Sequence, residues 1–101
     1  MSEDRRSYKK HITLNNRSFT RVIIDPHYEQ KHSDMSDRLI LELVSEFDGK
    51  EIDPDSAPKE GFEFFRYEIT YKGKIYRLIL TYGKEDFIGV VNAFRVKEKR
   101  T

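Results

Sequence analysis

The stretch that decides the fold is residues 62–96, FEFFRYEITYKGKIYRLILTYGKEDFIGVVNAFRV. Its apolar and aromatic residues form three runs, which are separated by Lys72-Gly73 and by Gly83-Lys84-Glu85-Asp86. Runs rich in Ile, Val, Tyr and Phe that end at glycine-containing turns are typical of antiparallel strands. The sequence therefore predicts a three-stranded antiparallel meander with strands at residues 62–71, 75–82 and 87–96.

The turn at Lys72-Gly73 sets the register between the first two strands. If it is a two-residue hairpin turn, Tyr71 lies opposite Lys74. Counting back gives three apolar pairs on one face: Ile69 with Tyr76, Tyr67 with Leu78, and Phe65 with Leu80. Because side chains alternate along a strand, Glu68 and Arg77 face each other on the second face, beside Arg66.

The third strand has a more apolar row, which we expect on the core face, and a second row on the other face. The first row is Ile88, Val90, Phe94 and Val96, and the second is Gly89, Val91, Ala93 and Arg95. This register requires an odd-length loop or a bulge near residues 83–86, since a four-residue loop would pair Tyr82 with Phe87. Burying an unpaired Arg95 would be costly, which favours the bulged loop.

The N-terminal half supplies a hairpin and a helix. Residues 11–24 are predicted to form a β-hairpin, with a tight turn at Asn15-Asn16, and Asp25-Pro26 ends its second strand. Residues 27–33 form a polar connection. A helix of about fourteen residues follows, because apolar residues recur at spacings of three and four. They are Leu39, Ile40, Leu43, Val44 and Phe47.

The helix has start and stop signals, and its apolar stripe needs a partner. Ser33 or Ser36 can cap its start, and Gly49 is the expected C-terminal stop. An amphipathic helix and a one-sided sheet are each unstable alone, so the stripe covers the apolar face of the meander. The fold class is therefore α+β: an N-terminal β-hairpin and one amphipathic helix packed on a C-terminal three-stranded antiparallel meander.

The chain of 101 residues has the length of one domain. We expect a single domain at residues 11–97, with disordered, charged tails at residues 1–10 and 98–101. Residues 50–61, which contain Pro54 and Pro58, are predicted to be a loop from the helix to the sheet.

Composition excludes several classes of protein. Lys and Arg number 19 against 18 Asp and Glu, so any polyanion site must be a local patch. The chain has no cysteine, which rules out disulfides, a thiolate nucleophile and cysteine-ligated zinc. Residues 1–10 are charged and lack the apolar stretch of a signal peptide, and no window is apolar enough for a membrane span, so we expect a cytoplasmic protein without membrane contact. No phosphate-binding glycine loop, nucleophilic serine elbow or dinucleotide fingerprint is present, and no cofactor is predicted.

The second sheet face is predicted to be a shallow basic floor that carries Arg66, Arg77 and Arg95 around Glu68. Arginines bind phosphate bidentately and can stabilise the charge of a phosphorane, and Glu68 could accept a proton. The alternative is that these are solvated strand residues, with a cross-strand ion pair between Glu68 and Arg77.

The connection after the hairpin holds His27 and His32, and histidine is the usual acid or base for transphosphorylation at neutral pH. The alternative is that both are loop histidines in water. Their spacing fits no common zinc motif, and no metal site is predicted. Tyr28, Tyr71 and Tyr82 could stack on RNA bases, or they could be half-buried core residues.

The helix followed by the terminal meander, with KIYRLI at residues 74–79 and GVVNAFR at residues 89–95, resembles the small RelE-like toxins of the barnase–EndoU–colicin–RelE nuclease group. The similarity covers roughly residues 26–97. It implies a metal-independent ribonuclease site on the sheet face away from the helices. On this basis the catalytic candidates are His27, His32, Glu68, Arg77 and Arg95, and the RNA-binding candidates are Arg66, Tyr28 and Tyr82.

Two functions therefore follow from the sequence. The first is a small, toxin-like, metal-independent endoribonuclease with RNA as its substrate and a small antitoxin as its protein partner. The second is a non-catalytic interaction module, an inhibitor or accessory subunit, that binds a protein through the same face or an exposed edge strand.

Overall fold

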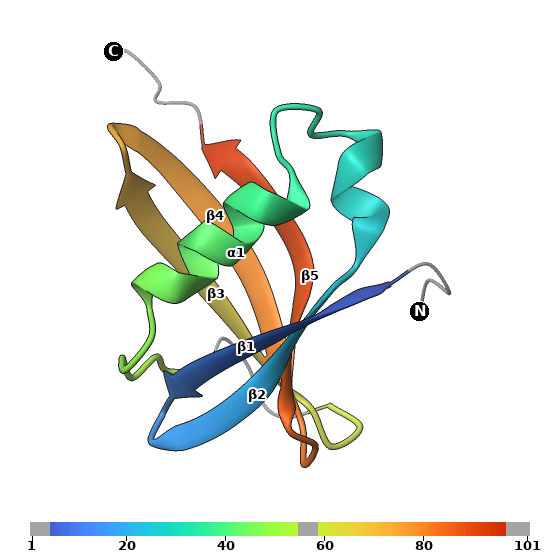
Figure 1. The fold of residues 1–101 in the computed structure, drawn as a ribbon, viewed down its shortest axis with the longest axis vertical. Coiled ribbons are helices and arrows are strands. Elements are labelled where there is room, and N and C mark those ends of the chain that lie inside the picture. The colour runs from blue at the N-terminus through green and yellow to red at the C-terminus, as the bar shows by residue number, and fades with distance from the viewer. Residues whose placement is uncertain (1–4, 55–58, 97–101) are drawn as a thin grey trace.

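The structure, a computed structural model, describes residues 5–54 and 59–96 and has an α+β fold (Figure 1). Its elements in chain order are the strands β1 (Arg6–Leu14) and β2 (Arg17–Ile24), the 3-10 helix η1 (Pro26–Gln30), the helix α1 (Asp37–Glu46), and the strands β3 (Glu63–Tyr71), β4 (Lys74–Tyr82) and β5 (Phe87–Val96). The α+β class and the C-terminal antiparallel meander agree with the sequence prediction. The 3-10 helix lies where only a polar connection was expected.

The strands form one five-stranded mixed sheet in the order β1-β2-β5-β4-β3. The hairpin β1–β2 and the meander β3–β4–β5 are antiparallel, as predicted. The sequence did not predict that the two units join, with β2 parallel to β5 from Arg21 opposite Phe87 to Ile24 opposite Val90. The hairpin and the meander therefore share one sheet and one core.

The first strand is longer than expected. β1 begins at Arg6, inside the segment at residues 1–10 that the sequence assigned to a disordered tail, so that boundary is wrong. Asn15 and Asn16 form the hairpin turn with φ of 55° and 62°, which matches a two-residue turn with both residues at positive φ. Residues 1–4, the tail predicted at 98–101, and residues 55–58 of the predicted loop lie outside the described residues.

The helix α1 lies across one face of the sheet, which we call the helix face, and the opposite side is the outer face (Figure 1). Ser36, not Ser33, caps the helix, because its Oγ accepts a hydrogen bond from the Leu39 N–H at 3.1 Å. Gly49 follows the helix with a φ of +86°, the left-handed conformation that favours glycine. The side chains that α1 buries against the helix face are Ile40, Leu43, Val44 and, directly after the helix, Phe47.

The pairing of β3 with β4 is the one that the sequence predicts. The turn at Lys72 and Gly73 has φ of 51° and 79°, and Tyr71 pairs with Lys74 beside it. Glu68 pairs with Arg77. The same ladder contains the three predicted apolar pairs, namely Ile69–Tyr76, Tyr67–Leu78 and Phe65–Leu80.

The last strand contains a β-bulge that the sequence did not predict. Leu80 pairs with Val90, but its neighbour Ile79 pairs with Asn92, so Val91 is the extra residue. Before this bulge, Ile88 and Val90 are buried on the helix face, as predicted. The register at the loop was therefore correct, and the change of register occurs within the strand.

Beyond the bulge, the alternation of β5 is opposite to the predicted one. Arg95 pairs with Tyr76 and so lies on the helix side, whereas Phe94 pairs with Arg77 on the outer face. Arg95 remains exposed there, so the desolvation cost that argued against this orientation does not arise at the open end of the strand. The predicted faces are therefore wrong for Ala93, Phe94, Arg95 and Val96.

Candidate functional site

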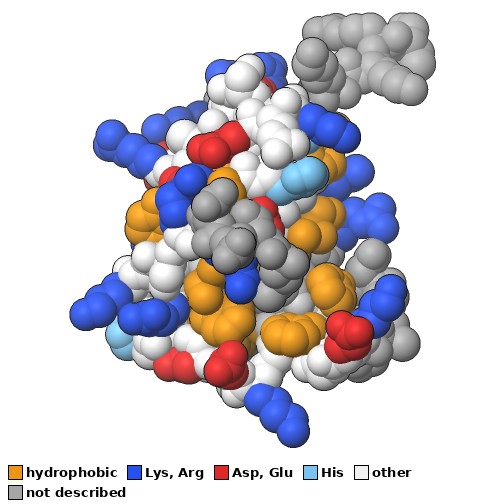
Figure 2. All heavy atoms as spheres, turned by 90° about the vertical axis from the view of Figure 1, so that its right-hand side faces the viewer, with side chains coloured by type: hydrophobic (Ala, Val, Ile, Leu, Met, Phe, Trp, Pro, Cys, Tyr) orange, Lys and Arg blue, Asp and Glu red, His pale blue; other side chains and the backbone are white. Residues whose placement is uncertain are grey.

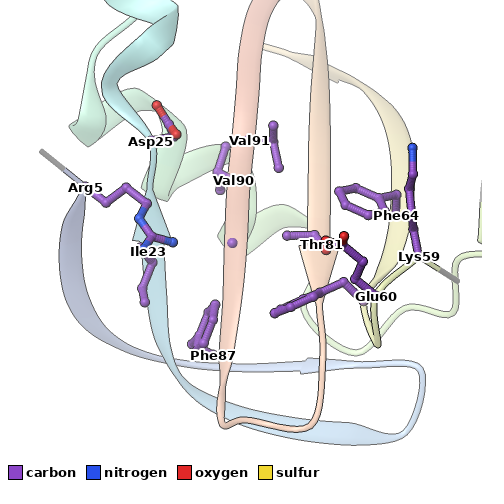
Figure 3. A pocket seen from close by; sticks show the side chains of 12 residues that line it. Arg5, Ile23, Asp25, Lys59, Glu60, Phe64, Thr81, Phe87, Val90 and Val91 are labelled. Atoms are coloured by element: carbon purple, nitrogen blue, oxygen red, sulfur yellow. The ribbon is translucent and has the colours of Figure 1, made fainter. Parts of the chain in front are cut away.

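The outer face of the sheet carries a groove of about 360 Å³ (Figure 3). Side chains of β2, β3, β4 and β5 line it, and α1 lies on the far side of the sheet. Its apolar lining includes Ile23, Phe62, Phe64, Phe87, Val90 and Val91. Hydrophobic side chains are also visible at the surface among Lys and Arg side chains on the flank shown in Figure 2. Such an exposed apolar group on the surface of a small domain is typical of an interaction site.

The groove exists because the centre of the outer face lacks large side chains. Gly89 pairs with Ile23 on one side and Thr81 on the other, in the middle of the sheet. A Cβ at Gly89 would lie 3.0 Å from Thr81 Cγ2, so this position accepts a larger residue only if Thr81 shifts. Glycine inside a strand often marks a close approach of a ligand or another backbone.

The polar groups around the groove are charged and lie at its rim. Arg5 and Asp25 stand on the β2 side, and Lys59 and Glu60 stand on the β3 side (Figure 3). Each side thus has one cation and one anion. Inside the groove, the hydroxyl of Thr81 donates to the Glu63 carbonyl at 2.8 Å. Among the described residues of the apolar floor, the polar side chain is that of Thr81, and its hydroxyl proton is therefore already used within the protein.

Some of the residues predicted to form the basic floor do lie together. Glu68 accepts a hydrogen bond from Arg77 Nε at 2.8 Å, and Arg66 lies on the same outer face. The Arg77 guanidinium is 5.8 Å from the centroid of the Phe94 ring, and the His32 ring stacks on the same Phe94 ring with a centroid distance of 5.2 Å. Phe94, which the sequence placed in the core, therefore connects His32 to the ion pair.

Other predicted residues are elsewhere. Arg95 lies on the helix side, so the basic floor loses one of its three arginines. His27 is exposed on η1, where its backbone N–H bonds Asp25 Oδ1 at 2.9 Å. Asp25 and Glu68 also place negative charge on this face, near the groove rim and beside Arg77 respectively. The outer face is therefore of mixed charge and not a basic platform.

Two of the three tyrosines proposed to stack on bases, Tyr28 and Tyr82, are core residues. Tyr28 is 2% exposed and Tyr82 is 8% exposed. The Tyr82 ring packs against Phe19 and Phe65, with centroid distances of 5.1 and 4.9 Å. Neither ring presents a free face to a nucleotide, so a base-binding role for Tyr28 and Tyr82 does not fit this structure.

The Tyr28 hydroxyl belongs to a network around Asp37 that the sequence did not indicate. Asp37, the first residue of α1, accepts from Tyr28 at 2.6 Å and from Tyr8 at 2.5 Å. Arg6 donates to both carboxylate oxygens, from Nε at 2.5 Å and Nη2 at 2.9 Å, and also bonds Glu29. The network therefore ties β1 and η1 to the start of α1.

The electrostatics of this network favour a charged Asp37. The hydrogen bonds from Arg6 lower the pKa of Asp37 to about 2, although desolvation opposes them, and the bonds from Tyr28 and Tyr8 add to the effect. Burial and the bond to Asp37 raise the pKa of the Tyr28 hydroxyl. The tyrosines therefore remain protonated donors. The geometry is that of a satisfied structural clamp, because each partner is already engaged.

In residues 5–54 and 59–96, no group of three or more His, Asp or Glu side chains could hold a metal ion. No helix in the same ranges is long and apolar enough to cross a membrane.

The chain matches no protein-family model, and no curated protein or solved structure is significantly similar to it. Function must therefore be inferred from the groove and its surroundings. The sequence did contain one signal for the groove, the isolated Gly89 within a strand. The residues around Asp37 showed only that it belongs to the first turn of a helix. They did not indicate its hydrogen-bond partners, which lie up to 31 residues away in sequence.

Proposed function

We propose that the protein is a non-catalytic interaction module that binds a partner protein through the groove on the outer face. The observation that carries this proposal is an apolar floor surrounded by charges of both signs. Protein interfaces commonly have this arrangement, with a hydrophobic centre that is shielded by a polar rim. The cytoplasmic location expected from the sequence is part of the same proposal.

The occupant is an aliphatic or aromatic side chain that a segment of the partner polypeptide presents. A small polar ligand would need several polar groups inside the groove to fix its orientation, whereas the described lining offers there only the Thr81 hydroxyl, whose proton already goes to the Glu63 carbonyl. A nucleic acid would need a cationic rim, whereas this rim carries the anions Asp25 and Glu60 as well as the cations Arg5 and Lys59. A polypeptide satisfies both conditions, since its backbone is neutral and its flanking side chains can carry either sign.

The test is selection of peptides from a random display library on the purified protein. We expect enriched peptides to share an apolar anchor residue and to bind Val91→Lys at least about tenfold more weakly. Val91 is 38% exposed, so this substitution adds a charge to the groove at little cost to folding. Ser18→Lys, at an exposed position of β2 that does not line the groove, is the matched control. Equal binding to both variants, or no enrichment, would reject the groove as the binding site.

A second candidate is the RelE-like, metal-independent endoribonuclease, which the cluster of His32, Phe94, Arg77 and Glu68 favours. In this proposal Arg77 stabilises charge on the scissile phosphate, and His32 or Glu68 accepts the proton of the attacking 2′-hydroxyl. The products are a cyclic or 3′-phosphate and a free 5′-hydroxyl. A small antitoxin would be the protein partner.

This candidate is tested by incubating the protein with varied RNAs in the presence of a chelator. Cleavage should be lost in Arg77→Ala and retained in Arg95→Ala, because only Arg77 lies on the outer face. Absence of cleavage by the unmodified protein counts against a nuclease. An equal loss in both variants would show that the cluster is not the site.

A further inference from the structure

The hairpin β1–β2 carries charge of only one sign. Residues 5–24 contain no Asp or Glu, and their cations are Arg5, Arg6, Lys9, Lys10, Arg17 and Arg21. The whole chain has 19 Lys and Arg against 18 Asp and Glu, so the other residues together are net negative. Positive charge is therefore concentrated at one end of the sheet, where the hairpin contributes the first two strands in the order β1-β2-β5-β4-β3.

Two of the hairpin cations are used within the protein. Arg6 bonds Asp37 and Glu29. Arg17 donates to two backbone carbonyls of the loop between β4 and β5, and its guanidinium lies over the ring of Phe19. Both arginines therefore have a structural role that explains their charge.

Lys9 and Arg21, which we call the basic pair, have no such role. They lie directly opposite each other in the β1–β2 ladder, and both are exposed. Within residues 5–54 and 59–96 neither forms an ion pair, and Arg21 donates only to the Ser7 hydroxyl, at 3.4 Å. The carboxylate of Asp86, just before β5, accepts from Thr20 instead. Like charges directly opposite are destabilising, and an anion bound between them would remove this repulsion.

The basic pair lies beside the groove, on the same outer face. Arg21 is opposite Phe87 in the parallel β2–β5 ladder, and Phe87 lines the groove. Lys9, Arg21 and Phe87 therefore form one row across three strands, next to the row that holds Ile23 and Gly89. With strands about 4.8 Å apart and about 3.4 Å per residue, the Cα atom of Gly89 lies roughly 8 Å from that of Arg21 and roughly 12 Å from that of Lys9.

We propose that the partner segment in the groove is acidic, with its apolar anchor over Gly89 and a carboxylate bound between Lys9 and Arg21. This inference rests on the proposed function of the groove and specifies the chemistry of its partner. An extended segment advances about 3.3 Å per residue, so the acidic residue stands about two to four positions from the anchor. Arg21 can hold a carboxylate through two parallel N–H bonds, and Lys9 adds a second positive charge.

A nucleic acid is the competing occupant for a basic pair. Asp25 and Glu60 stand at the rim of the adjoining groove, where a continuous phosphate chain would meet both carboxylates. A peptide carries its negative charge at separate positions and can present neutral backbone to these two residues. The distribution of charge around the groove therefore favours an acidic peptide.

The first test compares selections from one random peptide display library on different variants. Peptides enriched on the unmodified protein should carry Asp or Glu about two to four positions from the apolar anchor. Lys9→Glu combined with Arg21→Glu keeps a like-charge pair but reverses its sign, so we expect the same anchor with Lys or Arg in place of the acidic residue. Lys50→Glu combined with Lys74→Glu changes the net charge equally at two exposed positions outside the groove, and should again select acidic peptides.

The second test measures the Kd of one enriched acidic peptide. The Kd should rise by about tenfold or more in the Lys9→Glu, Arg21→Glu variant, and replacing the acidic residue of the peptide by Lys should restore the affinity. The affinity for the unmodified protein should fall as salt is raised, because the contact is exposed.

The outcomes separate this inference from the function of the groove. Apolar anchors without an acidic preference, or an equal Kd in both double variants, would overturn the acidic partner and leave the groove as the binding site. Acidic peptides that bind Val91→Lys as tightly as the unmodified protein would reject the groove, and with it this inference. Binding of a single-stranded RNA oligonucleotide that is lost in the Lys9→Glu, Arg21→Glu variant would assign the basic pair to nucleic acid and overturn the proposal.

Discussion

Replacing Asp37 by asparagine should weaken the hydrogen bonds that hold β1 and η1 to the start of α1, and so lower the free energy of unfolding. The carboxylate accepts four hydrogen bonds, two from Arg6 and one each from Tyr8 and Tyr28. An asparagine of the same shape offers only one acceptor oxygen and turns a donor NH₂ group toward these donors. The buried hydroxyl of Tyr28 or the guanidinium of Arg6 then lacks a partner.

The magnitude follows from the lowered pKa of Asp37. The change from 3.8 to about 2 corresponds to about 2.5 kcal/mol of preference for the charged form. The side chain of Asp37 is 16% exposed and that of Arg6 is 37% exposed, so solvent screening reduces this to about 1–2 kcal/mol. Loss of a partner for the Tyr28 hydroxyl adds about 1 kcal/mol. We therefore expect Asp37→Asn to lower the free energy of unfolding by about 2–3 kcal/mol.

Urea denaturation at neutral pH, followed by circular dichroism, measures this loss. Asp34→Asn is the matched control, because Asp34 is an exposed aspartate just before the same helix, and it should change the stability by less than about 0.5 kcal/mol. If Asp37→Asn is as stable as the unmodified protein, the network contributes nothing and the clamp interpretation is wrong.

The pH dependence of stability provides a second view of the same clamp. The folded-state pKa of Asp37 is lowered, so its contribution is fully present above about pH 4 and is lost as the pH falls toward 2. The difference in stability between the unmodified protein and Asp37→Asn should therefore shrink over that interval. A difference that stays constant from neutral pH to pH 2 would contradict the assigned pKa.

Two further substitutions test the packing and the turn. Leu43→Ala removes a fully buried side chain from the middle of the helix–sheet contact and should cost about 2–5 kcal/mol; an unchanged melting temperature would show that this face is not packed. Gly73→Ala places a side chain at a φ of +79° in the β3–β4 turn and should cost about 1 kcal/mol in the same denaturation assay, although nothing lies within 4 Å of the added Cβ. A stability gain in Gly73→Ala would refute the assigned turn.

Local patterns were sufficient wherever the controlling interaction was local. The turn at Lys72 and Gly73 fixed the whole β3–β4 register, because a two-residue loop permits only one pairing of the flanking strands. The apolar spacing of α1 identified its packed face, since helical periodicity is an intrinsic property of the segment. The pairing of Glu68 with Arg77 followed from the same counting.

The candidate sites were less predictable, because they depend on residues distant in the chain. The bulge at Val91 arises where β5 leaves its parallel pairing with β2 and continues along β4 alone, and it decided the faces of Phe94 and Arg95. The groove likewise needs Ile23 from β2 beside Gly89 from β5, and the sequence offered no signal for that parallel contact.

The sequence by itself determined the elements of this protein: a hairpin, one amphipathic helix and a meander with its first register set. Turns, caps and apolar periodicity depend on residues that are close together in the chain, so the sequence alone predicts the elements that they form. Only the tertiary structure decided that hairpin and meander form one sheet, that three arginines do not share a face, and that Asp37 joins Arg6 to Tyr28. These outcomes depend on contacts between segments far apart in sequence, which compete with one another only in the folded chain.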